Sequence, residues 1–409
     1  MRFASGWASR FSAMRHRDFR YLWLGNTIVM GGNQATFIAA SYLAYELTDS
    51  AFILGLVSMG FALPMLTLSL LGGALADRFP RKRILQLGQL LIAVSAASVA
   101  VAIKLDVVAW GHLLAASAVQ GVAFAFVVPA RQSLLADIVG EEQAGNAVAL
   151  VSVSFSVTGL LGPAVAGVLY DAIGPFGVYV VVLASDLLAV LCTSLVRHSA
   201  SPRVSSSPEK RSFLRDIGAG LRYVRNDGLL VALIVVALAF TVLAMPYRFL
   251  LPVLVVDVYQ QGPRTLGLLS SMIGLGAIVG ASYVAWSGRR WRGALLIGGA
   301  VASGLGLALV GTVPVLAVAV GLTVLVGVGD ALRRALNQAL LLESANAEYR
   351  GRVVSIYAMN FGLTPAGALP AGALAELLGV RMALVIFGVL LILLSAWIAL
   401  RSPRLLRYQ

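Results

Sequence analysis

One long apolar stretch contains an acid and two arginines, a charged group that could hold or release a proton through its acid. Asp330 precedes Arg333 and Arg334 by three and four residues, a spacing that places the three on one face of a helix. A buried acid of this kind is a candidate proton carrier. A permanent salt bridge is the alternative, and the spacing is compatible with both.

Other ionisable residues stand within or beside apolar stretches. A lone acid such as Asp186 could act in a proton relay, or it could be a hydrogen-bonded structural acid. Arg248 could contact an anionic or carbonyl-rich substrate. Its alternative role is an ion pair near the outer surface with Glu46 or Asp49.

The composition indicates that membrane helices position these residues. Hydrophobic residues make up 59% of the 409 residues and charged residues 12%, about half the charged share of a soluble protein. The net charge of +13 would suggest a nucleic-acid partner in a soluble chain. Here the basic residues lie between the apolar stretches, so we expect a lipid bilayer as partner and no nucleic acid.

Hydropathy and chain breakers predict an all-α membrane protein with about twelve transmembrane helices. The expected spans are Phe19–Leu47, Ser50–Ala76, Ile84–Ile103, Trp110–Ala130, Asn146–Tyr170, Val178–Val196, Leu229–Val256, Leu266–Ala285, Ala294–Val310, Pro314–Leu336, Val353–Ala375 and Ala383–Leu400. Nearly all bases fall on one side if both termini are cytoplasmic, as the positive-inside rule requires. We expect a multi-pass protein of a bacterial inner membrane.

A polar break divides the expected spans into two halves. Residues 1–197 form an N-terminal six-helix half, residues 198–228 a cytoplasmic linker, and residues 229–409 a C-terminal six-helix half. Apolar residues recur at helical spacing in the second part of the linker, which predicts an amphipathic helix on the inner membrane surface. A solvated connector helix is the alternative.

Short internal repeats accompany this division. GVLYDAIG at Gly167–Gly174 resembles GALAELLG at Gly372–Gly379, and each ends the fifth span of its half. The stretch from Gly73 to Asp77 begins in the same way at the end of the second span. Similar endings on opposite membrane faces predict inverted three-helix repeats.

The stretch GGALADRFPRKR, Gly72–Arg83, concentrates charge behind two glycines. Its bases, Arg78 and Arg81 among them, favour a cytoplasmic position. Gly73 permits close helix packing. The Asp77 carboxylate could meet a helix N-terminus or an arginine.

This stretch resembles the signature of the major facilitator superfamily, G-x-L-A-D-R-x-G-R-K/R, with Pro80 in place of a glycine. The stretches YELTDSAFILGLV, VVPARQSLLADIV, GLLGPAVAG, PYRFLLPVL and YRGRVVSIY resemble the branch that contains enterobactin exporters and macrolide-efflux proteins. The resemblance covers essentially the whole chain. It implies secondary active efflux, usually driven by proton entry.

The resemblance also implies roles for particular residues. Asp77, with Gly73, Arg78 and Arg81, would form an inner latch against the start of the eleventh helix, near Arg350 and Arg352; a topology signal alone is the alternative. Gly162-Pro163 would be a hinge or an interhalf contact, with an ordinary helix kink as the alternative. The residues expected on helices that line the path are Asn33, Gln34, Thr36, Tyr247, Arg248 and Asn337.

Proton coupling is the least determined of these roles. Many relatives carry an acid where this chain has Asn33, which cannot titrate. Coupling would then fall to Asp330, Asp186 or Glu46, or the protein would not be proton-driven.

We therefore expect a transporter, not an enzyme, that exports a small amphipathic drug-like or siderophore-like molecule by proton antiport. It would act by alternating access, as a monomer and without a cofactor. A uniporter or symporter of a metabolite or lipid, and a receptor-like protein without net flux, are the alternatives. The chain has no nucleotide-binding glycine loop for ATP and no cluster of metal-ligating histidines.

Overall fold

All the secondary structure in the described part of the chain is helical. The structure, a computed structural model, describes residues 12–197, 221–288, 291–346 and 363–406, together with residues 349, 353, 356, 357 and 360. The side chains of residues 70, 73, 74, 76, 77, 141 and 364–366 lie outside this description. Helices are expected here, because a helix satisfies its backbone polar groups internally and can therefore cross a bilayer.

The chain divides into two compact units. The first unit contains residues 1–47 and 60–206, and the second contains residues 48–59 and 207–409. The division differs from the expected halves in one respect, because the start of the second expected span belongs to the second unit. The proposed linker, residues 198–228, is described only from residue 221 onward, so its amphipathic helix remains a prediction.

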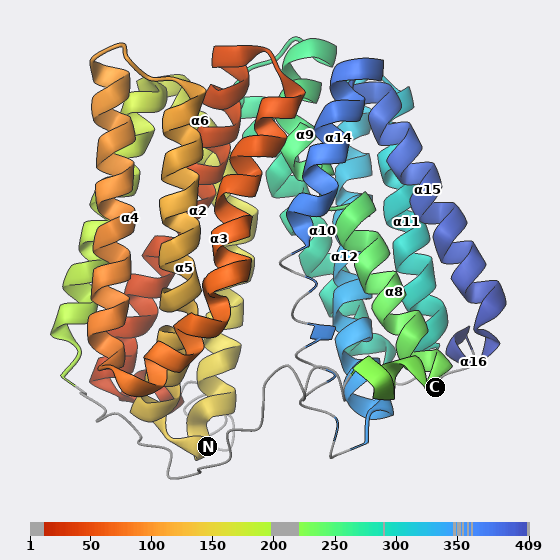
Figure 1. Ribbon diagram of the computed structural model, residues 1–409, viewed down its shortest axis with the longest axis horizontal. Helices are drawn as coiled ribbons and strands as arrows, with labels where there is room; N and C mark the ends of the chain where they lie inside the picture. Colours follow the sequence, from red (N-terminus) through yellow and green to blue (C-terminus); the bar gives the residue numbers. More distant parts are fainter. Residues whose placement is uncertain are drawn as a thin grey trace, which may run out of the picture. The chain divides into compact units, whose positions relative to one another are not determined.

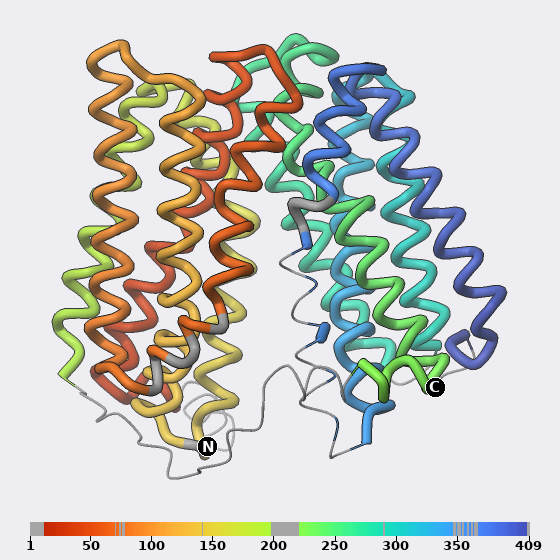
Figure 2. The backbone as a smooth tube through the Cα atoms, in the orientation of Figure 1, coloured from red at the N-terminus to blue at the C-terminus, as the bar shows by residue number. Residues whose placement is uncertain are grey.

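Long helices build the first unit (Figure 1). They are α2 (Arg17–Thr48), most of α3 (Ala51–Arg78), α4 (Arg81–Lys104), α5 (Trp110–Val139) and α6 (Glu141–Leu195), preceded by the 3₁₀ turn η1 (Ser12–Arg15). The backbones of α4 and α5 run side by side in opposite directions (Figure 2). Glycines permit close approaches in this unit: a Cβ atom on Gly121 of α5 would lie 2.0 Å from the Phe61 carbonyl oxygen of α3.

Helix α6 consists of two helices separated by a break at Gly174. Gly174 has φ 67°, in the left-handed region that favours glycine, and Pro175 follows it. The two parts correspond to the expected spans Asn146–Tyr170 and Val178–Val196.

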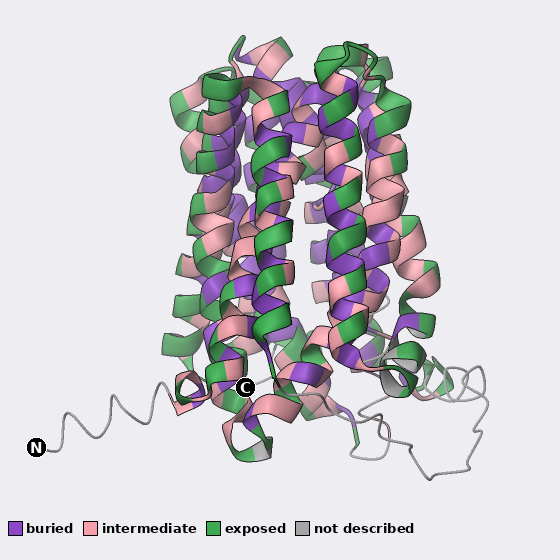
Figure 3. Ribbon diagram, turned by 90° about the vertical axis from the view of Figure 1, so that its left-hand side faces the viewer, coloured by how far each residue is buried: buried purple, intermediate pink, exposed green. Residues whose placement is uncertain are grey.

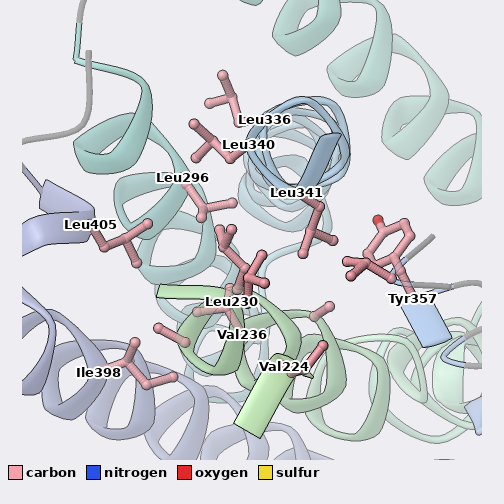
Figure 4. Close-up of a cluster of buried hydrophobic side chains, with 14 of the residues drawn as sticks. Val224, Leu230, Val236, Leu296, Leu336, Leu340, Leu341, Tyr357, Ile398 and Leu405 are labelled. Carbon is pink, nitrogen blue, oxygen red and sulfur yellow. The ribbon is translucent and has the colours of Figure 1, made fainter. Parts of the chain in front are cut away.

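The second unit is built from α8 to α16 in the same manner. Its elements are α8 (Gly228–Leu243), α9 (Tyr247–Val253), the π-helical turn η2 (Leu254–Val258), α10 (Pro263–Ser287), α11 (Arg292–Thr312), α12 (Leu316–Ser344), α14 (Thr364–Leu378), α15 (Val380–Arg401) and α16 (Pro403–Leu406). Leucine, isoleucine and valine side chains from these helices form a buried core near α8, labelled in Figure 4.

Small residues bring α12 close to both of its neighbours. A Cβ atom on Gly327 would lie 2.1 Å from the Ile273 carbonyl oxygen of α10, and one on Gly329 would lie 2.2 Å from the Gly299 carbonyl oxygen of α11. Such backbone contacts are typical of helices that associate within a membrane. They hold the charged residues of α12 in a defined place.

The repeated octapeptides end in the same backbone conformation. Gly379 has φ 82° where α14 ends, and Gly174 has φ 67° at the break in α6. The acid of the second copy, Glu376, accepts hydrogen bonds from the amide groups of Ala51 (2.9 Å) and Phe52 (3.4 Å). It therefore caps the start of α3 within the second unit. The inverted order of the repeats remains a prediction.

The helices present apolar side chains on their exposed sides. On α4, Leu87, Val94 and Val101 are 67%, 65% and 55% exposed and lie at intervals of two turns on one face. Exposed and buried residues alternate around the helices in Figure 3. In the part of the chain that the structure describes, nine helices are long and apolar enough to cross a membrane. The total of about twelve spans remains a prediction.

Candidate functional site

Three charged residues of α12, Asp330, Arg333 and Arg334, form an ion-pair cluster that is buried except for Arg334, whose side chain is 36% exposed. Asp330 and Arg333 are 6% and 2% exposed, and Arg333 Nη2 donates to Asp330 Oδ1 at 3.0 Å. Arg334 Nη2 donates to the other carboxylate oxygen. The three residues lie within about one helical turn, so their side chains meet on one face of α12. Their spacing in the sequence predicts this contact.

Residues of α9 and α12 line a recess beside this cluster. Tyr247, Arg248 and Asp330 line it together with apolar side chains, and its volume is about 20 Å³. The side chain of Arg248 is exposed although it lines this recess within the helical unit. The buried Tyr247 hydroxyl and the Nε and Nη1 atoms of Arg333 have no protein partner. The cluster therefore has hydrogen-bond donors that the described side chains do not use.

Asn337, expected on the path, is fully buried on α12. Its Nδ2 donates to the Leu233 carbonyl oxygen of α8 at 2.8 Å. Asn360 makes a similar contact, with the Ala237 carbonyl oxygen at 3.2 Å and the Thr241 hydroxyl at 2.8 Å. The Oδ1 atom of Asn337 is buried without a protein partner, so its expected place on the path remains a prediction. Sequence reasoning did not single out Asn360.

A second polar group lies in the first unit between α2 and α5. Arg131 Nη1 donates to Asn26 Oδ1 at 2.5 Å, whereas its Nη2 is buried without a partner. Nearby on α2, the Thr27 hydroxyl donates to the Ser154 hydroxyl of α6 at 2.9 Å. An arginine inside an apolar helix is costly unless it is paired, so Arg131 belongs to the candidate site.

The expected path residues of α2 begin about two turns further along the same helix. Asn33, Gln34 and Thr36 are partly buried. Thr36 lines a recess of about 20 Å³ with Gln120 and Tyr179, and its hydroxyl donates to the Gly32 carbonyl oxygen at 3.0 Å.

Gly162 brings α6 against this polar part of α2. A Cβ atom on Gly162 would lie 2.9 Å from the Gln34 Cβ atom, so the glycine permits the close approach. Pro163 lies inside the helix, and the marked backbone break of α6 is at Gly174. The hinge at Gly162-Pro163 therefore remains a proposal.

The remaining two proton-carrier candidates have different surroundings. Asp186 is 2% exposed, and its Oδ2 atom has no hydrogen-bond partner. Glu46 is exposed and accepts a hydrogen bond from the Tyr170 hydroxyl at 2.9 Å. Of these two acids, only Asp186 has the buried carboxyl group that a proton carrier needs.

The basic loop after α3 makes contacts inside the first unit. Arg81 forms a largely buried salt bridge with Asp137 of α5, in which the side chains are 9% and 10% exposed. Arg78 is exposed. The structure does not describe the surroundings of Gly73 or the side chain of Asp77, nor the residues Arg350 and Arg352. The inner latch between these two groups therefore remains a proposal. Sequence reasoning missed Asp137, which lies 56 residues from Arg81.

Long helices with apolar outer surfaces show that this is a multi-pass membrane protein, and the family to which it belongs shows that it is a transport protein, not an enzyme. The chain belongs to the transmembrane secretion effector family, whose profile matches residues 8–406, within the major facilitator superfamily. The resemblance inferred from GGALADRFPRKR is confirmed.

Similar proteins of known name cover nearly the whole chain. The chain is 26% identical to the multidrug efflux pump Tap of Mycolicibacterium fortuitum, over 91% of this chain and 93% of that protein. It is 25% identical to macrolide efflux protein A of Streptococcus pyogenes, over 92% and 94%. It is 24% identical to the staphyloferrin A transporter of Staphylococcus aureus, over 90% and 92%.

The fold is similar to that of solved transporters. The crystal structure of the nucleoside transporter NupG matches with a TM-score of 0.77 at 12% identity, over 96% of this chain and all of that chain. At this identity the likeness establishes the fold alone. It supports the predicted all-helical transporter architecture.

Proposed function

We propose that this protein is a secondary active exporter of small amphipathic molecules, drug-like or siderophore-like, in a bacterial cell membrane. It works by alternating access, with both termini in the cytoplasm, and uses proton entry to drive export. The observation that carries the proposal is the set of buried, incompletely paired charged groups in apolar helices of a chain from this family. Relatives named for multidrug efflux, macrolide efflux and staphyloferrin A transport support export.

We assign the proton-carrying role to Asp186 in preference to Asp330. Two arginines neutralise the Asp330 carboxylate, whereas Asp186 Oδ2 has no partner. A buried carboxylate without a partner is costly, by several kcal/mol, and binding a proton removes that cost. Asp186 can therefore change its protonation state without breaking an ion pair.

An efflux assay tests the proposed function. Cells that express the protein should lose a labelled macrolide, a cationic dye or a catecholate siderophore faster than control cells, and a protonophore should abolish the difference. Asp186→Asn should weaken proton-driven efflux at least about tenfold, because asparagine cannot carry a proton. The exposed Asp171→Asn is the matched control.

Three results would count against parts of this proposal. Efflux that persists with the protonophore would contradict proton coupling. Uptake in place of efflux would favour a symporter or uniporter. Ligand binding without flux of any compound in either direction would favour a receptor-like protein.

The start of α3 offers a separate test of the structural basis for alternating access. Helix α3 begins in the second unit, where Glu376 caps it, and continues in the first unit. We propose that this cap forms and breaks during transport. Glu376→Ala should weaken it by about 1–2 kcal/mol, and the amide groups of Ala51 and Phe52 should then exchange hydrogen roughly 5–30 times faster.

Hydrogen exchange followed by mass spectrometry measures this effect in peptides that cover the start of α3. The control is Asp171→Ala, which changes the corresponding acid of the other repeat copy. Equal exchange at Ala51 and Phe52 in Glu376→Ala and the unmodified protein would contradict the capping role.

A further inference from the structure

We infer that the arginine cluster of the second unit binds the anionic group of the transported molecule, a carboxylate in the simplest case. The cluster consists of Arg248, Arg333, Arg334 and Asp330. The inference deepens the proposed function and depends on it in one respect, because the bound anion is taken to be part of the cargo.

The charges in the cluster do not balance. In the described part of the chain, Asp330 is the acid that pairs with Arg333 and Arg334, and Arg248 lines the recess beside the same carboxylate. One negative charge therefore faces three guanidinium groups. Of the three arginines only Arg333 is buried, and positive charge that is not balanced at membrane depth is costly, so an anion at this place would lower the cost.

The cluster also has hydrogen-bond donors that the described side chains do not use. Arg333 uses Nη2 for Asp330, and its Nε and Nη1 atoms are buried without a partner. The guanidinium group of Arg333 stacks on the Phe240 ring at 4.2 Å from the ring centroid, which holds its plane in position. Each unused Arg333 atom can donate a hydrogen bond of its own, whereas the planar guanidinium group of Arg248, which lines the recess, can match the two oxygens of a carboxylate.

The size and lining of the recess indicate which part of a ligand it accepts. A volume of about 20 Å³ holds one or two water-sized groups, comparable to the two oxygens of a carboxylate and far smaller than a drug-sized molecule. Phe240, Ile273 and Val326 provide apolar walls, and the buried Tyr247 hydroxyl is an unused donor.

The charged residues in the lining are Arg248 and Asp330. Asp330 is already paired with Arg333 and Arg334. The net charge around the recess is therefore positive, which suits the anionic end of an amphipathic molecule better than a cationic group.

A set of three small probes tests this inference without any transport step. The probes are 2-naphthoate, its neutral amide 2-naphthamide and the cation 2-naphthylmethylammonium, which share one ring system. Isothermal titration calorimetry on the purified full chain in a neutral detergent should show that 2-naphthoate binds about 10–100 times more tightly than the amide. The cation should bind more weakly than the amide.

Variants of Arg248 locate the binding site. Arg248 has an exposed side chain, so Arg248→Gln is compatible with folding. This variant should reduce the affinity for 2-naphthoate to that for the amide. Arg248→Lys should give an intermediate affinity, because lysine keeps the charge and loses the two-pronged geometry. The matched control is Arg264→Gln, an exposed arginine at the start of α10 in the same unit.

Equal affinities for 2-naphthoate and 2-naphthamide would overturn the inference. So would an unchanged affinity for 2-naphthoate in Arg248→Gln. Nanodiscs with and without phosphatidylglycerol distinguish a dissolved anion from a lipid headgroup: equal affinity in both supports the inference, and loss of binding with the anionic lipid overturns it. Because this readout is binding, a failure of the proposed export function would appear in the efflux assay and not here.

Discussion

Replacement of Asp330 by asparagine is expected to destabilise the protein by about 3–5 kcal/mol, the usual cost of removing one partner from a buried ion pair. Asp330 is the described counterion of Arg333, which is 2% exposed, and of Arg334. The variant would leave a buried guanidinium group without a negative partner. The measurement is the thermal unfolding temperature of the purified protein in detergent.

Two further variants make this result specific. Asp106→Asn makes the same chemical change in an exposed loop and should leave the unfolding temperature unchanged. Asp330→Asn combined with Arg333→Gln should recover part of the loss, because the second change removes the stranded charge. If Asp330→Asn unfolds at the temperature of the unmodified protein, the ion pair is not structural and Asp330 returns as a proton-carrier candidate.

Replacement of Gly327 by valine is expected to cost about 3 kcal/mol, the upper part of the usual range for overpacking. A Cβ atom at this position would lie 2.1 Å from the Ile273 carbonyl oxygen. The obstructing atom belongs to the backbone of α10, so a side-chain rotation cannot relieve the clash. The variant should therefore separate α10 from α12 and displace the Asp330 cluster.

The matched control for this prediction lies in the same helix. A Cβ atom on Gly321 of α12 would have no neighbour within 4 Å, so Gly321→Val should unfold close to the temperature of the unmodified protein. Size-exclusion chromatography and thermal unfolding in detergent measure both variants. Similar losses in the two variants would show that valine disturbs α12 itself and that the contact with α10 is not decisive.

The boundaries of most helices could be predicted from local features of the chain. The expected span Ile84–Ile103 falls within α4 (Arg81–Lys104), and the boundary between Tyr170 and Val178 contains the break at Gly174. Hydropathy predicts the span, because a helix that crosses the bilayer needs a long apolar stretch. The glycine–proline pair Gly174-Pro175 predicts the break, because a left-handed backbone conformation favours glycine. The ion pair of Asp330 was equally predictable, since its partners lie within one helical turn.

Contacts between distant parts of the chain were beyond such reasoning. Asn337 donates to the Leu233 carbonyl oxygen, 104 residues away. Glu376 caps an amide group 325 residues away. The sequence contains no local pattern that pairs such residues, because helix packing decides which faces meet.

The sequence by itself determined that this chain is a membrane transport protein of the major facilitator superfamily, and it determined where most of its helices begin and end. Apolar length, the distribution of bases and the signature at Gly72–Arg83 are properties of the linear chain. Only the tertiary structure decided that Arg248 lies beside the Asp330 cluster and that Arg81 pairs with Asp137. Those neighbours depend on the close packing of helices through their glycines, so the unbalanced charge became visible only once the helices were in place.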